Sequence, residues 1–114
     1  MRVKRGVASH KRHQKIRKAT KGMTRAHRSS IKRGRQAQVR ALQFSYRDRR
    51  NRKREFRSLW NIRINAAARQ NGTTYSQLIA NLKKSNINLD RKVLSELAVN
   101  EPAAFEAVVK AAIK

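Results

Sequence analysis

Positive charge is concentrated in the first half of this chain of 114 residues. Residues 1–60 hold 22 of the 30 lysines and arginines against two acids, Asp48 and Glu55, which gives this half a formal charge of +20. The remaining residues contribute only +4 to the total of +24. Because like charges at this density destabilise a compact state, the first half needs a polyanion to neutralise it before it can become compact.

Side chains able to form a hydrophobic core lie mainly in the second half. Five of the six aromatic residues lie at or after Tyr46, and the chain has no cysteine for a disulfide or a thiolate metal site. We therefore predict a basic extension at residues 1–58, a disordered tail followed by a long helix, and a globular helical domain at residues 59–114. A core of about 55–60 residues is stable but marginal. No apolar run approaches the ~20 residues of a membrane span, and no secretory signal is visible.

The extension is expected to depend on its partner for order. Residues 1–22 have too few large apolar groups to offset chain entropy and should be disordered alone. Residues His10–Lys21 should become helical on a partner, with Gly22 ending the helix. From Thr24 to Gln70 the chain has no proline and a single glycine, Gly34, which predicts one long helix with a kink or break at that glycine.

An apolar stripe marks the last part of this long helix. Phe56, Trp60, Ile64 and Ala67 recur at helical spacing, so we expect Phe56 and Trp60 to belong to the core. The pair Asn71-Gly72 should end the helix.

Three short helices should follow. Thr74 and Gln77 form a capping box that opens the first, Asp90 can cap the second, and Pro102 stands in the first turn of the third. No segment alternates with period two, so the predicted fold class is all-α without a sheet.

Catalysis and metal binding have little support. The six acids are scattered, the glycines are too far apart for a phosphate loop, and no acid–base couple shares a helix face. His10, His13 and His27 lie in the basic extension without nearby acids, where we expect them to face solvent or phosphate. We predict no enzyme activity, no metal and no cofactor.

Nucleic-acid binding is the favoured function. The segment Arg47–Arg57 has seven bases in eleven residues, placed all round a helix axis, so it must lie in solvent or in a polyanion. Such cations release counterions from phosphates, and arginine forks suit phosphate and base edges. A long helix charged all round suits insertion between RNA helices better than one groove of a duplex. Phe44 and Tyr46 are candidates for stacking on bases, with local packing as the alternative for Phe44.

The predicted RNA-binding residues are mostly the cations of the extension. They are Arg2, Lys4, Arg5, Lys11, Arg12, Lys15, Lys18, Lys21, Arg25, Arg28, Lys32, Arg33, Arg35, Arg40, Tyr46, Arg47, Arg49, Arg50, Arg52, Lys53, Arg54, Arg57, Arg69, Lys83 and Lys84. Polar residues near the end of the long helix form a second candidate surface, for which ordinary helix capping is an equal alternative. This surface comprises Asn65, Arg69, Gln70, Asn71, Thr73, Tyr75, Ser76, Lys83 and Lys84.

Residues Tyr46–Thr73, YRDRRNRKREFRSLWNIRINAAARQNGT, closely resemble the bacterial and organellar large-subunit ribosomal protein L20 family. The segments Arg2–Gly6 (RVKRG), Tyr75–Ile79 (YSQLI) and Asp90–Ala98 (DRKVLSELA) resemble the same family in the same order. The resemblance covers essentially the whole chain, and the first of these runs is long and specific.

The resemblance implies a structural protein that binds large-subunit rRNA directly, acts early in subunit assembly and has no enzymatic role. Its expected partners are that rRNA, neighbouring large-subunit ribosomal proteins and, as in some bacteria of the family, its own messenger RNA, whose translation it would repress. No membrane or DNA partner is expected. The implied location is the ribosome in the cytoplasm, with an organellar stroma or matrix as the alternative.

Three other classes are weaker. A DNA-compacting basic protein would bind any duplex without preferring folded rRNA. A membrane-active cationic helix needs a strong apolar face, which the extension lacks. An enzyme needs a catalytic constellation, which the sequence does not contain.

Overall fold

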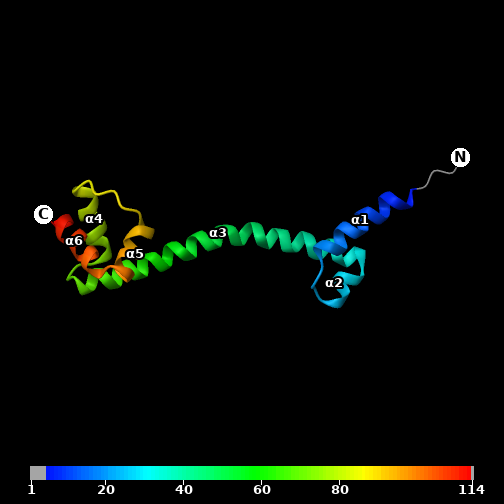
Figure 1. Cartoon of the computed structure of the whole chain (residues 1–114), viewed down its shortest axis with the longest axis horizontal. Helices are drawn as coiled ribbons and strands as arrows, with labels where there is room; N and C mark the ends of the chain where they lie inside the picture. Colours follow the sequence, from blue (N-terminus) through cyan, green and yellow to red (C-terminus); the bar gives the residue numbers. More distant parts are fainter. Residues whose placement is uncertain (1–4, 114) are drawn as a thin grey trace. The chain divides into compact units, whose positions relative to one another are not determined.

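The computed structural model of the chain describes residues 5–113, and these residues are helical with connecting turns (Figure 1). The helices are α1 (Gly6–Ala19), α2 (Arg25–Ser29), α3 (Ile31–Gln70), α4 (Tyr75–Lys84), α5 (Arg91–Asn100) and α6 (Pro102–Ile113). The predicted all-α fold, with a long basic helical extension and a small C-terminal helical domain, is confirmed. The chain divides into two compact units, Met1–Arg50 and Asn51–Lys114, and α3 contributes to both. The predicted domain boundary between residues 58 and 59 stays a prediction.

The first helix ends at a buried threonine. The Thr20 side chain is fully buried, and its Oγ1 donates a hydrogen bond to the Ile16 carbonyl at 3.0 Å. Gly22 follows with a φ of 86°, a left-handed conformation that few other residues adopt. The helix predicted for His10–Lys21 is thus present and stops before Gly22, although it begins earlier, at Gly6. Disorder of this segment without RNA stays a prediction.

The long helix expected from Thr24 to Gln70 is divided, but at Ser30 rather than at Gly34. Ser30 separates α2 from α3 with an extended ψ of 124°, and its carbonyl accepts a 2.7 Å hydrogen bond from the Gly34 amide. Serine is a favoured residue at helix starts, which explains why the break occurs there. A break at Gly34 itself is excluded, because Gly34 lies inside α3, whereas a kink there stays a prediction.

Gly34 serves close packing between helices. Its position is buried. A Cβ atom built on it would lie 3.2 Å from Cγ2 of Ile16 and 3.5 Å from Cγ2 of Thr20, both near the end of α1. The absence of a side chain therefore lets α3 pass close to α1.

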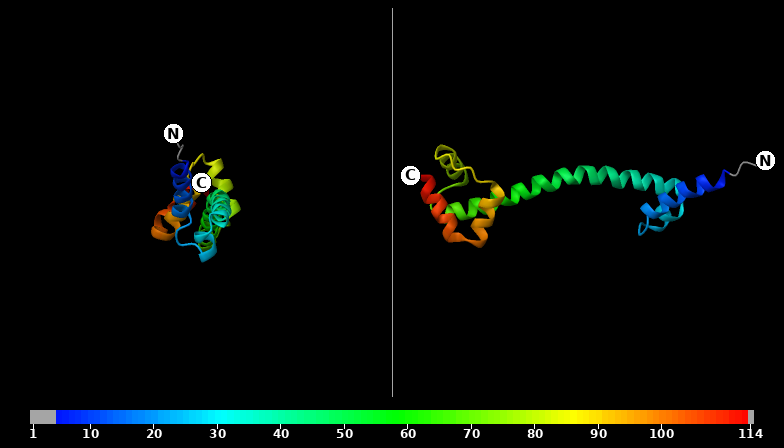
Figure 2. Two further views of the ribbon diagram at one scale, coloured as in Figure 1. Left: turned by 90° about the vertical axis from the view of Figure 1, so that its right-hand side faces the viewer. Right: turned by 45° about the horizontal axis from the view of Figure 1, so that its top comes forward.

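The hydrophobic core of the second unit joins the last turns of α3 to α4, α5 and α6. These three helices gather about that end of α3 in Figure 1 and in the right-hand view of Figure 2. The buried core residues are Ile64, Ala67, Ala68, Leu78, Leu82, Leu94, Phe105, Val109 and Ala112. Apolar side chains at helical spacing on four helices thus supply one shared core.

The helix ends follow the predicted signals with one exception. Gly72 ends α3 with a φ of 73°, and the Thr73 amide donates to the Ala68 carbonyl at 3.0 Å, as in a Schellman cap. The capping box of Thr74 and Gln77 opens α4, and Pro102 is the first residue of α6. Asp90 is the N-cap residue of α5 as predicted, but its side chain makes no capping hydrogen bond.

The expectation that Phe56 and Trp60 belong to the core is wrong as well. Phe56 is 49% exposed and Trp60 is half-buried, whereas Ile64 is fully buried. The core of α3 begins at Ile64, because the three short helices α4, α5 and α6 cover only the last turns of this 40-residue helix. The apolar stripe therefore continues beyond the core that it was expected to join.

Candidate nucleic-acid interface

The predicted RNA-binding side chains are presented to solvent. Arg2 and Lys4 lie outside the described residues, and each of the other predicted residues, from Arg5 to Lys84, is exposed. Arg17 and Arg63 are exposed cations that the sequence-based set omitted, although their charge alone would have found them. Exposure is what a phosphate contact requires, and the contact with RNA itself stays a prediction.

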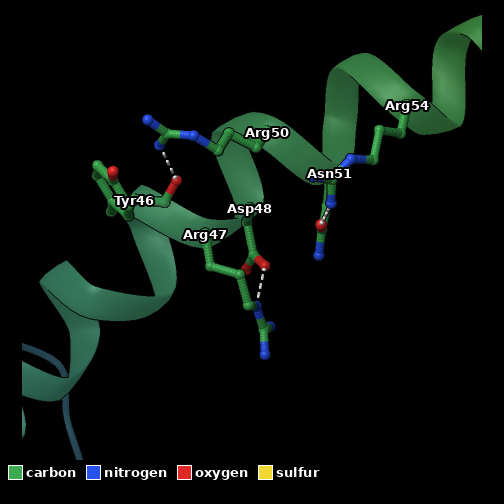
Figure 3. A network of polar contacts seen from close by, with 6 residues as sticks. All are labelled: Tyr46, Arg47, Asp48, Arg50, Asn51 and Arg54. Atoms are coloured by element: carbon green, nitrogen blue, oxygen red, sulfur yellow. Dashed lines mark hydrogen bonds and ion pairs between the residues drawn. The ribbon is translucent and has the colours of Figure 1, made fainter.

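Most of this charge has no carboxylate beside it. Within residues 5–113 the ion pairs are Arg47 Nε with Asp48 Oδ1 at 2.8 Å (Figure 3) and Lys110 Nζ with Glu106 Oε1 at 2.6 Å. Lys110 also lowers the pKa of the Glu106 carboxyl, first through its hydrogen bond and then through its charge. The remaining described cations therefore have no carboxylate partner within the chain.

Phe44 and Tyr46 pack against arginines of their own helix. The Arg40 and Arg47 guanidinium carbons lie 5.1 and 4.7 Å from the centre of the Phe44 ring. Arg50 lies 3.9 Å from the Tyr46 ring centre and donates to the Tyr46 carbonyl at 3.4 Å (Figure 3). Such cation–π contacts favour local packing for Phe44, the alternative left open by the sequence. Base stacking by Tyr46 stays a prediction.

A basic surface hollow lies in the first unit. It has a volume of about 920 Å³ and is lined by His27, Lys32, Arg35, Gln36, Ala37, Val39, Arg40 and Gln43. His27 Nδ1 lies 3.1 Å from Thr24 Oγ1, which orients its ring. Three cations and no acid line this hollow, so it suits a phosphate of a nucleic-acid backbone.

The second candidate surface is used largely for internal hydrogen bonds. Asn65 Oδ1 accepts from the Tyr75 amide at 3.3 Å, and Asn71 Nδ2 donates to the Ala67 carbonyl at 2.9 Å. The Thr73 hydroxyl donates to Gln77 Oε1 at 3.4 Å. Capping therefore accounts for Asn65, Asn71 and Thr73. RNA contact by Arg69, Lys83 and Lys84 stays a prediction.

A polar chain then links three helices of the second unit. The Tyr75 hydroxyl donates to Asn61 Oδ1 of α3 at 2.9 Å and accepts from Arg91 Nε of α5 at 2.9 Å. Neither Asn61 nor Arg91 was among the sequence candidates. Their role depends on contacts between helices that a sequence pattern does not display.

The described part of the chain shows neither a metal-binding cluster nor a membrane-spanning helix. No three His, Cys, Asp or Glu side chains between residues 5 and 113 lie close enough to hold a metal ion. None of the described helices has the length and apolar character needed to cross a membrane.

The amino-acid sequence is similar to that of known proteins. Residues 2–108 match the family described as "Ribosomal protein L20". The chain is also 58% identical over 111 residues to "Large ribosomal subunit protein bL20" of Methylobacterium sp. (strain 4-46), an alignment that covers 97% of this chain and 89% of that protein. The similarity extends through both compact units.

Proposed function

The chain belongs to the ribosomal protein L20 family, and we propose that it acts as a structural, non-enzymatic component of the large ribosomal subunit. In this role it binds large-subunit rRNA directly and supports assembly of the subunit. The observation that carries the proposal is the exposed positive charge of α1, α2 and α3, which has almost no carboxylate beside it within the described residues. Such a surface requires a polyanion.

The basic extension supplies affinity without reading sequence. Each lysine or arginine that meets a phosphate releases condensed counterions, so binding weakens as salt increases. The Arg47–Arg57 segment of α3 carries cations on all sides of the helix. It is therefore better suited to lie between several RNA helices than in one groove of a single duplex. The extension is expected to become ordered as its charge is neutralised, and then to hold neighbouring rRNA helices together.

The second unit supplies a fixed shape. Its core joins α3, α4, α5 and α6, so we expect this part of the chain to fold without RNA. A shaped surface of this kind can recognise a folded RNA junction through its backbone geometry. We therefore assign docking to the second unit and charge neutralisation to the extension.

The proposal also covers the protein partners and the location of the chain in the cell. Neighbouring large-subunit ribosomal proteins are the expected protein partners, and the ribosome, in the cytoplasm or in an organelle, is the expected location. No DNA or membrane partner is proposed. Repression of the protein's own messenger RNA stays a prediction, which a translation reporter carrying that messenger would test.

Omission from a reconstitution tests the assembly role. Large-subunit particles are assembled from rRNA and the other subunit proteins, with and without this chain, and then separated by sedimentation. We expect particles that lack the chain to sediment more slowly and to recover when it is added. Identical sedimentation in both cases would contradict a role in assembly.

A further inference from the structure

Phe56 and Trp60 form an aromatic pair on the surface of α3. Their ring centres lie 6.3 Å apart with an angle of 28° between the ring planes. Phe56 is 49% exposed and Trp60 is half-buried. Neither residue belongs to the core of the second unit or to the partly buried residues packed against it. The core therefore does not account for this pair.

The pair lies in a hollow whose other lining residues are all cationic. The hollow has a volume of about 480 Å³ and is lined by Arg52, Lys53, Arg54, Phe56, Arg57 and Trp60. Glu55, the nearest acid along the chain, points about 100° away from Phe56 around the helix axis. The hollow thus combines a flat apolar surface with positive charge at its rim.

The faces of these two rings differ from those of the other exposed aromatics. Phe44 and Tyr46 each have arginines of the same helix over their rings. In the part of the chain that the structure describes, no arginine or lysine lies over Phe56 or Trp60 in this way. The faces that these two rings do not turn toward each other are therefore not covered by a cation of the chain.

We propose that Phe56 and Trp60 form a stacking site for an unpaired nucleobase of RNA, with the surrounding cations binding the phosphates on either side of that base. This inference rests on the proposed function, since it names a local contact that rRNA would make. Charge complementarity selects the ligand: a nucleotide presents a planar ring between anionic groups, whereas a simple anion would leave the aromatic pair unused. The site complements the phosphate contacts of the extension, because it recognises an unstacked base rather than backbone alone.

The chain offers a direct reporter, because Trp60 is its only tryptophan. Fluorescence of the full-length protein is recorded during titration with single-stranded oligouridylate and, separately, with an abasic sugar–phosphate oligomer of the same length. We expect the oligouridylate to quench Trp60 emission through stacking and the abasic oligomer, which has the same charge, to leave it largely unchanged. Equal responses to both ligands would overturn the proposal.

Affinity for rRNA gives a second, independent measurement. Replacing Trp60 with leucine should weaken binding by about fivefold to a hundredfold at fixed salt, the range for losing one stacked base. Leu59→Ala is the matched control, because Leu59 is an exposed apolar neighbour that does not line the hollow, and its replacement should leave affinity unchanged. Thermal unfolding of each variant checks that its second unit remains folded.

The outcomes separate this inference from the proposed function. If Trp60→Leu binds rRNA as tightly as the natural protein, the stacking site is wrong and the ribosomal role stands. If Trp60 emission responds only when a neighbouring ribosomal protein is added, the pair is a protein contact and the proposal is overturned. Failure of the natural protein to prefer rRNA over other polyanions would instead contradict the proposed function.

Discussion

A Cβ atom on Gly34 would lie 2.8 Å from the carbonyl oxygen of His27. Protein Cβ atoms essentially never approach a neighbour so closely, and this neighbour is backbone, which cannot rotate away as a side chain can. The close approach joins the end of α2 to the start of α3, next to the packing of Gly34 against α1. Glycine at this position therefore permits the helices of the basic extension to pack together.

Replacing Gly34 with alanine should weaken RNA binding. The substitution forces the segment around His27 away from α3, at a cost of about 1–2 kcal/mol after allowing for the better helix propensity of alanine. Because the extension is expected to become ordered on RNA, this cost should appear as a loss of roughly tenfold in affinity.

Gly6→Ala is the control for this variant. Gly6 also lies in a helix, but a Cβ there meets nothing within 4 Å. Its affinity should equal or slightly exceed that of the natural protein. If the two variants bind equally, the packing around Gly34 does not form in the complex.

Leu94→Ala should destabilise the second unit, whereas Phe56→Ala should not. Leu94 is fully buried in the core, so its truncation should cost about 2–5 kcal/mol. Phe56 is 49% exposed, and its removal should change stability by less than about 1 kcal/mol. Calorimetric unfolding of both variants measures the difference. Equal destabilisation would mean that the aromatic pair belongs to the core after all.

Tyr75→Phe should loosen the link between α3, α4 and α5. The hydroxyl that this change removes donates to Asn61 and accepts from Arg91, and each such bond contributes about 0.5–1.5 kcal/mol. We expect the free energy of unfolding to fall by roughly 1–2 kcal/mol in denaturant titration. Tyr46→Phe is the matched control, because Tyr46 is exposed on α3 outside this polar chain, and an unchanged Tyr75→Phe variant would show that water replaces both bonds.

Neutralising Arg49, Arg50 and Lys53 together should flatten the salt dependence of RNA binding. All three side chains are exposed on α3 and none pairs with a carboxylate among the described residues. For every phosphate contact that is lost, the negative slope of log affinity against log salt should become shallower by up to roughly one unit. An unchanged slope would show that these residues do not bind phosphate.

Local signals in the sequence predicted most of the helix ends correctly. Features that depend on packing between distant segments were not predicted. Gly72, the Thr74–Gln77 box and Pro102 act within one turn of their helices, so the sequence located those ends correctly. The break at Ser30 was missed although serine is a favoured residue at helix starts. The packing role of Gly34 depends on α1 and α2 lying against α3, which helix propensity does not report.

In the candidate site, too, some residues were predicted from the sequence and others were not. Charge alone predicted the exposed cations, because a segment such as Arg47–Arg57 has seven bases against two acids and cannot be buried without an external anion. Phe56 and Trp60 were misplaced because helical spacing identifies an apolar stripe but not how far the neighbouring helices extend along it. Asn61 and Arg91 were missed because only the folded chain brings them to Tyr75.

Competitive binding at one near-physiological salt concentration tests the central claim most directly. The full-length protein is offered folded large-subunit rRNA in the presence of excess duplex DNA and excess unrelated folded RNA. We predict a preference of roughly a hundredfold or more for the rRNA, because a shaped second unit adds specific docking to the uniform attraction of the extension. Equal binding to all three would contradict the account and would favour a basic protein that compacts nucleic acid of any sequence.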